Sequence, residues 1–132
     1  MLEGTTILLA EDELPVRKLV SEVLHRHGCV VLEAHSGPDA IQVSEKHKGS
    51  IDLLVADYEM PGMSGLELAE RLRASRPDLP VILMSGSPEG IANSHIRGFP
   101  FIRKSFVPAA LTDLIEKTLG EHGETQRTKS AS

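Results

Sequence analysis

Residues 53 to 65 read LLVADYEMPGMSG, and they carry a clear signal of the fold class. Its first four residues are all apolar, which is the pattern of a short strand buried on both faces, as in a parallel sheet. The strand ends at Asp57, and Pro61-Gly62 then predicts a sharp turn. Ser64 and Glu67 have the spacing of a capping box, so a helix is expected to start there.

Similar apolar runs recur on both sides of this stretch. The expected strands occupy residues 7–10, 30–32, 53–56, 81–84 and, as a weaker candidate, 99–102. The segments between the strands carry apolar residues at helical spacing. The expected helices cover Val16 to Leu24, a segment that opens at Ser36, the segment after Ser64, and Leu111 to Leu119.

Glycine and proline predict where these helices end. Gly28 is expected to stop the first helix and Gly120 the last one. The segment 88–98 contains Pro88, Gly90 and Gly98, so we expect only a short or irregular helix there.

Strands that alternate with helices predict a doubly wound α/β domain. Right-handed crossovers would place helices on both faces of a five-stranded parallel sheet. A length of 132 residues suits one such domain. We assign residues 1–120 to it, and we expect the polar residues 121–132 to form a flexible tail.

The composition excludes several classes of protein. No apolar run approaches the roughly 20 residues of a membrane span, and the N-terminus does not have the pattern of a signal peptide. Cys29 is the only cysteine, which suits a reducing, cytoplasmic compartment. The net charge of −5 argues against direct binding of nucleic acid.

Chemically useful side chains follow the ends of the predicted strands. They are Glu11 and Asp12 after the first strand, Asp57 after the third, Ser85 after the fourth and Lys104 after the fifth. Because ligands of open α/β sheets bind outside the carboxyl ends of the strands, we expect these residues to converge at one edge.

Three carboxylates at one edge require a neutralising charge. Two charges about 4 Å apart repel each other by roughly 4 kcal/mol at an effective dielectric constant of 20. A hard divalent cation with oxygen ligands relieves this repulsion, and Mg²⁺ suits a site of few carboxylates, water and a phosphate oxygen. Capping of the first helix is the alternative role for Asp12, and it is the role we expect for Glu13.

Asp57 has the chemistry of a phosphoryl acceptor. The turn that follows it leaves its carboxylate free to attack phosphorus and form an acyl phosphate. Ser85 could donate a hydrogen bond to one phosphoryl oxygen, and Lys104 could pair with another. Such positioning and charge stabilisation account for most of the catalysis in phosphoryl transfer.

The acidic pair, the Asp-Tyr-Glu-Met-Pro-Gly segment, the serine and the lysine, in that order, resemble the receiver domains of two-component response regulators. The resemblance covers nearly residues 5–119. It implies a flavodoxin-like fold with strand order 2-1-3-4-5, and a Mg²⁺-dependent switch that catalyses only its own phosphorylation and dephosphorylation. Its implied partners are a histidine kinase or phosphotransfer protein and a downstream protein, and its implied state is a monomer or weak dimer.

The resemblance also implies roles for individual residues. By it, Asp57 is the phosphoacceptor, and Ser85 and Phe101 are the switch residues. The implied Mg²⁺ ligands are Asp12 and Asp57 directly, Glu11 through water and Glu59 through its backbone carbonyl.

Three departures from the family pattern affect the region around Lys104. Ser105 replaces the proline that usually follows the lysine in the family, where the peptide bond between the two residues is cis. A non-proline cis bond costs about 2.5–4 kcal/mol, so we expect a trans bond or local strain here. Val107 stands where a capping residue commonly begins the last helix, which costs roughly 1 kcal/mol. The segment from Ser85 to Lys104 is short, as in receivers of hybrid histidine kinases, so we expect a stand-alone regulator or such a receiver.

Three other functions compete with the phosphoacceptor. A pseudo-receiver, which binds partners without phosphorylation, would have the same fold. An aspartate-nucleophile phosphatase would have an Asp-x-Asp pattern after the first strand, where this chain has Glu11-Asp12. A dinucleotide-binding domain would have a glycine-rich first turn, and the acidic residues present there would repel a pyrophosphate.

Overall fold

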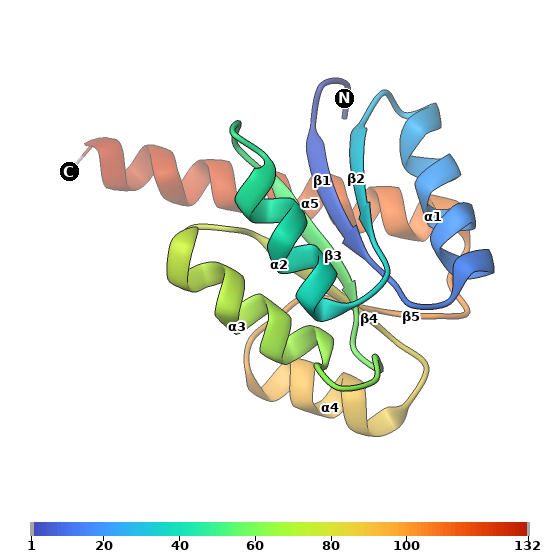
Figure 1. Ribbon diagram of the computed structural model, residues 1–132. Coiled ribbons are helices and arrows are strands. Elements are labelled where there is room, and N and C mark those ends of the chain that lie inside the picture. Colours follow the sequence, from blue (N-terminus) through green and yellow to red (C-terminus); the bar gives the residue numbers. More distant parts are fainter. Residues whose placement is uncertain (1, 132) are drawn as a thin grey trace.

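The computed structural model describes the backbone of residues 2–131 and the side chains of residues 2–121. Its five strands form one parallel sheet in the order β2-β1-β3-β4-β5 (Figure 1). The strands are β1 (Thr6–Ala10), β2 (Val30–Ala34), β3 (Leu53–Asp57), β4 (Val81–Ser85) and β5 (Phe101–Arg103). The predicted fold class and the strand order implied by the resemblance are confirmed.

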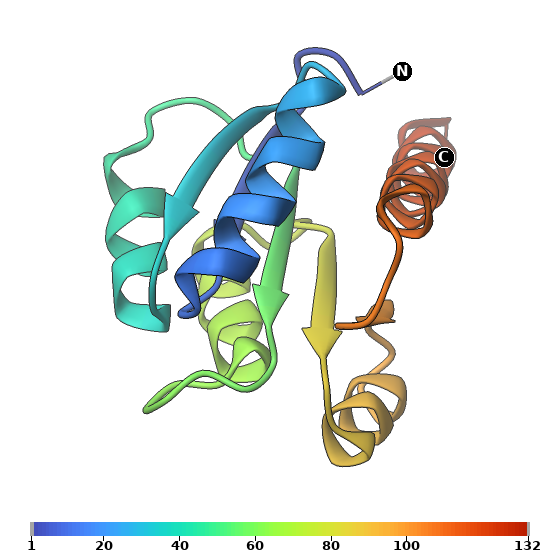
Figure 2. The same ribbon diagram turned by 90° about the vertical axis from the view of Figure 1, so that its right-hand side faces the viewer.

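Helices connect the strands and cover both faces of the sheet (Figure 2). They are α1 (Leu14–Arg26), α2 (Gly37–Lys46), α3 (Gly65–Ser75), α4 (Pro88–Ile96) and α5 (Pro108–Ala131). No helix among the described residues combines the length and the apolar character that crossing a membrane requires.

The sheet has a separate hydrophobic core on each face, because successive side chains of a strand point in opposite directions. Leu8 and Leu54 belong to the core under α2 and α3, together with Leu68 of α3. Leu9 and Val55 belong to the core under α1 and α5. This division explains why the central strands have continuous apolar runs.

Serine side chains cap the N-termini of three helices. Ser36 Oγ accepts from the Asp39 amide at 3.1 Å, and Ser64 Oγ accepts from the Glu67 amide at 3.1 Å. Ser87 Oγ accepts from the Gly90 amide at 3.0 Å, and this cap begins a nine-residue α4. The helix expected in this segment is therefore short, as predicted, and is a regular α-helix.

The last helix differs from the prediction. It continues to Ala131 rather than ending at Gly120. Gly28 ends α1 with a φ of 81°, but Gly120 is not among the glycines with positive φ, so it does not terminate its helix. The side chains after Glu121 lie outside the described residues, and the division into a domain and a flexible tail remains a prediction.

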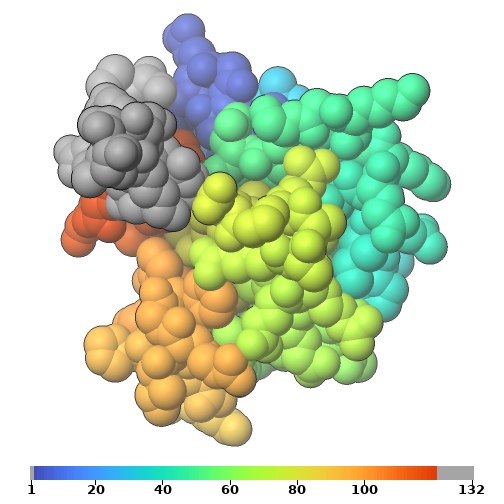
Figure 3. All heavy atoms as spheres, turned by 90° about the vertical axis from the view of Figure 1, so that its left-hand side faces the viewer, coloured from blue at the N-terminus to red at the C-terminus, as the bar shows by residue number. Residues whose placement is uncertain are grey.

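α4 lies beside α3 on the molecular surface (Figure 3). Arg97, which follows α4, forms an ion pair with Glu70 of α3 at 2.7 Å between Nη1 and Oε2. Both side chains are about half exposed, so this ion pair contributes little to stability. Only Gly90 and Ser94 of α4 are buried.

Candidate functional site

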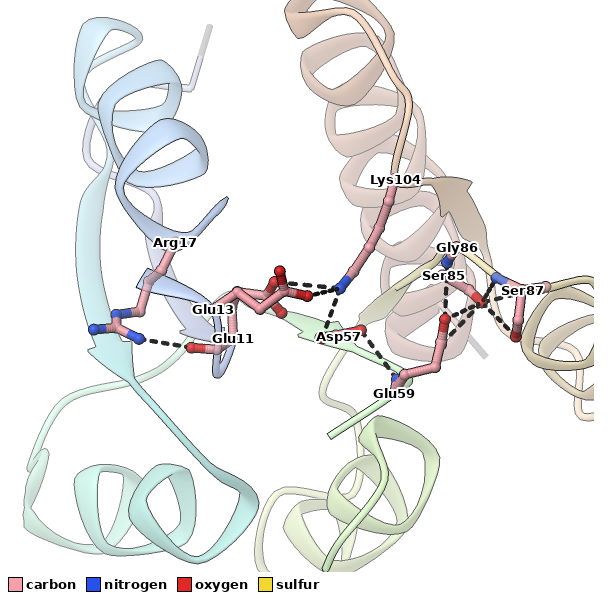
Figure 4. Close-up of polar contacts among 9 residues, drawn as sticks. All are labelled: Glu11, Glu13, Arg17, Asp57, Glu59, Ser85, Gly86, Ser87 and Lys104. Carbon is pink, nitrogen blue, oxygen red and sulfur yellow. Dashed lines mark hydrogen bonds and ion pairs between the residues drawn. The ribbon is translucent and has the colours of Figure 1, made fainter. Parts of the chain in front are cut away.

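The polar residues predicted to follow the strands converge at the carboxyl edge of the sheet, where Figure 4 shows Glu11, Asp57, Ser85 and Lys104. Glu11 follows β1, while Asp57 and Ser85 are the last residues of β3 and β4. Lys104 follows β5 and extends back across the edge toward the first and third strands. Parallel strands place all these ends on one side, so residues far apart in sequence become neighbours.

Four carboxylates form a cluster at this edge. Each of Glu11, Asp12, Glu13 and Asp57 offers an oxygen within 4.8 Å of the others. Two buried oxygens, Glu11 Oε2 and Asp12 Oδ1, have no hydrogen-bond partner among the described residues. Buried polar atoms without a partner are costly, and hard divalent cations bind such oxygens, so these residues fit Mg²⁺.

Glu13 does not act as the helix cap that the sequence predicts. It occupies the N-cap position of α1, but its side chain makes no capping hydrogen bond. Its carboxylate instead accepts from Lys104 Nζ at 3.3 Å. Through this contact Glu13 belongs to the acidic cluster.

Lys104 is the cation that neutralises part of this cluster. Its Nζ lies 2.8 Å from Asp57 Oδ2 and 3.3 Å from Glu11 Oε1. No cis peptide bond occurs among the described residues, so the bond between Lys104 and Ser105 is trans, as expected. Lys104 therefore contacts Asp57 without a proline after it.

Asp57 is fully buried, and both of its oxygens accept hydrogen bonds. The Glu59 amide donates to Oδ1 at 3.0 Å, and Lys104 donates to Oδ2 at 2.8 Å. Burial raises the pKa of Asp57, while the Glu11 and Lys104 side chains and the Glu59 amide lower it, leaving it above its usual value. The carboxylate is thus held in one orientation in a poorly solvated position.

The pKa values of Glu11 and Lys104 are also shifted by burial and by neighbouring charges. Burial, with the neighbouring Asp57 carboxylate, raises the pKa of Glu11 to about 8, although Lys104 opposes the rise. Burial lowers the pKa of Lys104, but its contacts with Asp57 and Glu11 raise it above its usual value. Perturbed groups that face one another at a strand edge are typical of functional sites.

The side chain of Glu59 makes contacts that the sequence did not predict. Its carboxylate oxygens lie 3.0 and 2.9 Å from the hydroxyl of Ser85, and the Gly86 amide donates to Oε1 at 2.8 Å. Ser85 itself is fully buried. No local sequence signal marks this contact, because it joins the loop after β3 to the loop after β4.

Arg17 is a residue of the site that sequence analysis missed. Its Nη1 donates to the backbone carbonyl of Glu11 at 2.8 Å (Figure 4). Its Nε lies 3.4 Å from Glu33 Oε1 on β2. Arg17 thus connects the start of the β1–α1 loop to the neighbouring strand. Its sequence position on the first turns of α1 does not separate it from an ordinary surface arginine.

Phe101, the switch residue implied by the resemblance, is half-buried on β5. It pairs in register with Leu83 of β4 and borders a hollow of about 370 Å³ lined also by Ile91 and His95 of α4. It is therefore placed beside α4 rather than among the carboxylates. Its role as a switch remains a prediction.

Comparisons with known proteins agree with this fold and site. The family model of the response regulator receiver domain matches residues 7–116 of this chain. The sensor kinase CckA of Brucella abortus is 34% identical over 119 residues, which cover 88% of this chain and 13% of that protein. A chemotaxis protein CheY homolog of Campylobacter jejuni is 32% identical over 120 residues, covering 86% of this chain and 92% of that protein.

Solved structures show the same fold. The receiver domain from the hybrid histidine kinase CckA has a TM-score of 0.73 and 32% identity, covering 86% of this chain and 98% of that one. A receiver domain protein from Clostridium thermocellum has a TM-score of 0.83 at 22% identity, covering 92% and 98%. The fold is thus that of the CheY-like receivers. The chain belongs to the response regulator receiver domain family.

Proposed function

We propose that this chain is a phosphoacceptor of a two-component relay, in which Asp57 accepts a phosphoryl group in a Mg²⁺-dependent reaction. One observation carries the proposal. Asp57 is fully buried and oriented by Lys104 and the Glu59 amide, beside Glu11 Oε2 and Asp12 Oδ1, which have no hydrogen-bond partner in the part of the chain that the structure describes. A carboxylate held in one orientation beside such oxygens is suited to nucleophilic attack on phosphorus.

The residues that would hold Mg²⁺ follow from the family resemblance and fit the acidic cluster. Asp12 and Asp57 would bind it directly, Glu11 through water and Glu59 through its backbone carbonyl. The ion would neutralise the carboxylates and the oxygens of an incoming phosphate. Glu13, an exposed member of the cluster, accepts a hydrogen bond from Lys104.

The protein groups then have distinct roles in the transfer. An oxygen of Asp57 forms a bond to phosphorus while the phosphorus–nitrogen bond of a phosphohistidine breaks, and the electron pair remains on the imidazole nitrogen. Lys104 Nζ lies 2.8 Å from Asp57 Oδ2, so its positive charge would stand beside the oxygens of a phosphoryl group that Asp57 accepts. Because positioning and charge carry the reaction, the domain would catalyse only its own phosphorylation and dephosphorylation.

Phosphorylation would change the surface that a partner contacts. The added charge of about −2 attracts the hydroxyl of Ser85 and the ammonium of Lys104. Ser85 leads directly into the loop before α4, and Phe101 borders α4 from β5. We propose that this region binds a downstream protein and that the donor is a histidine kinase or phosphotransfer protein. The protein would act in the cytoplasm as a monomer or weak dimer.

The relatives support two settings for such a switch. The CheY homolog has nearly the length of this chain, whereas the match to CckA is a small part of a sensor kinase. We therefore propose either a stand-alone regulator or the receiver of a hybrid kinase.

Intact mass after incubation with acetyl phosphate tests the proposal. The native chain should gain one phosphoryl group in the presence of Mg²⁺ and none when the metal is chelated. Asp57→Asn should not be labelled, whereas Asp113→Asn, which changes an exposed carboxylate of α5, should be labelled like the native chain. If Asp57→Asn is labelled at the native rate, the assignment of the acceptor is wrong.

The pseudo-receiver is the alternative function. It predicts no mass gain with acetyl phosphate or with a phosphorylated histidine kinase, and partner binding that is the same in the native chain and Asp57→Asn. All four carboxylates of the acidic cluster are present, and Lys104 contacts Asp57. Both observations favour the phosphoacceptor function over the pseudo-receiver.

A further inference from the structure

Tyr58, the residue after Asp57, connects the functional site to α4. It is the only tyrosine in the sequence. Its hydroxyl accepts a hydrogen bond from Asn93 Nδ2 of α4 at 2.7 Å. The contact is partly buried and joins residues that are 35 positions apart.

The ring of Tyr58 also lies against the first turn of α4. A Cβ atom at Gly90 would lie 2.9 Å from Tyr58 Cδ1, and it would clash with Ser85 Oγ as well. The absence of a side chain at Gly90 therefore lets α4 approach both residues. Tyr58 and Ser85 contact the same turn of the helix.

The backbone of Tyr58 is fixed at the active edge of the sheet. Its amide donates to the Met84 carbonyl of β4 at 2.7 Å, and its carbonyl accepts from the Gly65 amide at 3.1 Å. The next amide, that of Glu59, donates to Asp57 Oδ1 at 3.0 Å. One residue thus has its backbone in the hydrogen-bond network around Asp57 and its side chain on α4.

α4 makes few other buried contacts with the rest of the domain. Gly90 and Ser94 are its buried residues, and its ion pair to α3 through Arg97 is at the surface. Phe101 also borders α4, but it has no hydroxyl with which to form a comparable hydrogen bond. The contact between Tyr58 and Asn93 is consequently well placed to influence where α4 lies.

We propose that Tyr58 is a positioning residue whose hydrogen bond to Asn93 couples the charge on Asp57 to the placement of α4. This inference rests on the proposed phosphoacceptor function. When Ser85 turns toward a phosphoryl group on Asp57, the first turn of α4 that packs on its hydroxyl must adjust. The bond between Tyr58 and Asn93 opposes that adjustment, so it stabilises the unmodified arrangement.

Coupling of this kind is reciprocal. If a charge on Asp57 moves α4 away from Tyr58, then removal of the bond between Tyr58 and Asn93 must favour the acceptance of that charge. Loss of the bond should therefore make phosphoryl acceptance roughly three- to tenfold more favourable, the range that a single hydrogen bond supplies.

The single tyrosine allows a direct measurement of this contact. Protein labelled with 3-fluorotyrosine should give one ¹⁹F resonance in the folded state. Asn93→Ala should move this resonance without any phosphodonor, and Mg²⁺ with acetyl phosphate should move it in the native chain. Glu89→Ala, an exposed substitution on the same helix, should leave it in place. An unchanged resonance in Asn93→Ala would overturn the proposal.

Labelling measured by intact mass tests the coupling itself. At limiting acetyl phosphate, the ratio of phosphorylated to unphosphorylated protein should be three- to tenfold higher than in the native chain. We expect this increase in Tyr58→Phe, which keeps the ring, and in Asn93→Ala. The double variant should match the single ones, because both remove the same bond. Native-like labelling of both single variants, or additive gains in the double variant, would overturn the coupling and leave the phosphoacceptor function standing. If the native chain itself is not labelled, both proposals fail.

Discussion

The hydroxyl of Ser85 lies 3.0 Å from Oε1 and 2.9 Å from Oε2 of Glu59. The Gly86 amide donates to the same carboxylate at 2.8 Å. Two donors at the end of β4 are thus directed to a carboxylate of the protein itself. A phosphoryl group on Asp57 would add a charge of about −2 nearby, and it would compete with Glu59 for these donors.

Replacement of Glu59 by glutamine should therefore speed phosphoryl acceptance. Glu59→Gln keeps the length of the side chain but removes the negative charge, so the competition for Ser85 and the repulsion of the phosphodonor both weaken. We expect labelling by acetyl phosphate to become several-fold faster, as measured by intact mass over time. Glu89→Gln, an exposed change on α4, is the matched control, and equal rates in both variants would contradict the prediction.

Loss of Lys104 should destabilise the protein in a metal-dependent way. Lys104→Met removes the cation that contacts Asp57, Glu11 and Glu13. We expect the free energy of unfolding in urea to fall by about 1–3 kcal/mol without Mg²⁺, less than for a fully buried pair because 20% of the Lys104 side chain is exposed. Excess Mg²⁺ should restore much of the loss, since it replaces the missing charge.

The control for this prediction is Lys117→Met, an exposed substitution on α5, which should change the free energy of unfolding little. A loss at Lys104 that is the same with and without Mg²⁺ would show that the lysine and the ion do not neutralise the same carboxylates.

Stability without Mg²⁺ should decrease as the pH rises from about 4.5 to about 8. The pKa of Glu11 is raised from 4.5 to about 8, chiefly by burial, so in this range the folded protein holds a proton that the unfolded chain has released. The slope is up to about 1.4 kcal/mol per pH unit for one proton. Asp57, whose pKa is also raised by burial, acts in the same direction.

Urea unfolding at several pH values measures this slope. Glu11→Gln, which stays neutral, should flatten the profile, and an unchanged slope in that variant would assign the proton to another group. Because a metal ion must displace the same proton, the affinity for Mg²⁺ should rise with pH until about 8 in the native chain.

Two glycines should respond to alanine in opposite ways. In Gly90→Ala the new Cβ would clash with Ser85 and lie 2.9 Å from the Tyr58 ring, so we expect a loss of about 1–3 kcal/mol in the free energy of unfolding. Gly120 lies exposed within α5, with nothing within 4 Å of such a Cβ. Gly120→Ala should therefore add about 0.5–1 kcal/mol, because alanine favours helix. Thermal unfolding of both variants tests this prediction, and equal changes in stability would contradict it.

The parallel α/β fold and the residue types at the edge of its sheet could be predicted from the amino-acid sequence. Apolar runs around Leu54 and helical stripes such as that of α1 are local patterns, and burial on both faces of a strand leaves a clear record in them. Since parallel strands share one carboxyl edge, the positions of Asp57, Ser85 and Lys104 after their strands were enough to predict that they converge.

The atoms that meet at that edge could not be predicted in the same way. Glu13 binds Lys104 instead of capping α1, Glu59 binds Ser85, and Tyr58 reaches Asn93. The direction of a polar side chain depends on partners from distant parts of the chain, about which hydrophobic periodicity holds no information. The end of α5 is a similar case, because a glycine stops a helix only where it adopts a positive φ, and Gly120 does not.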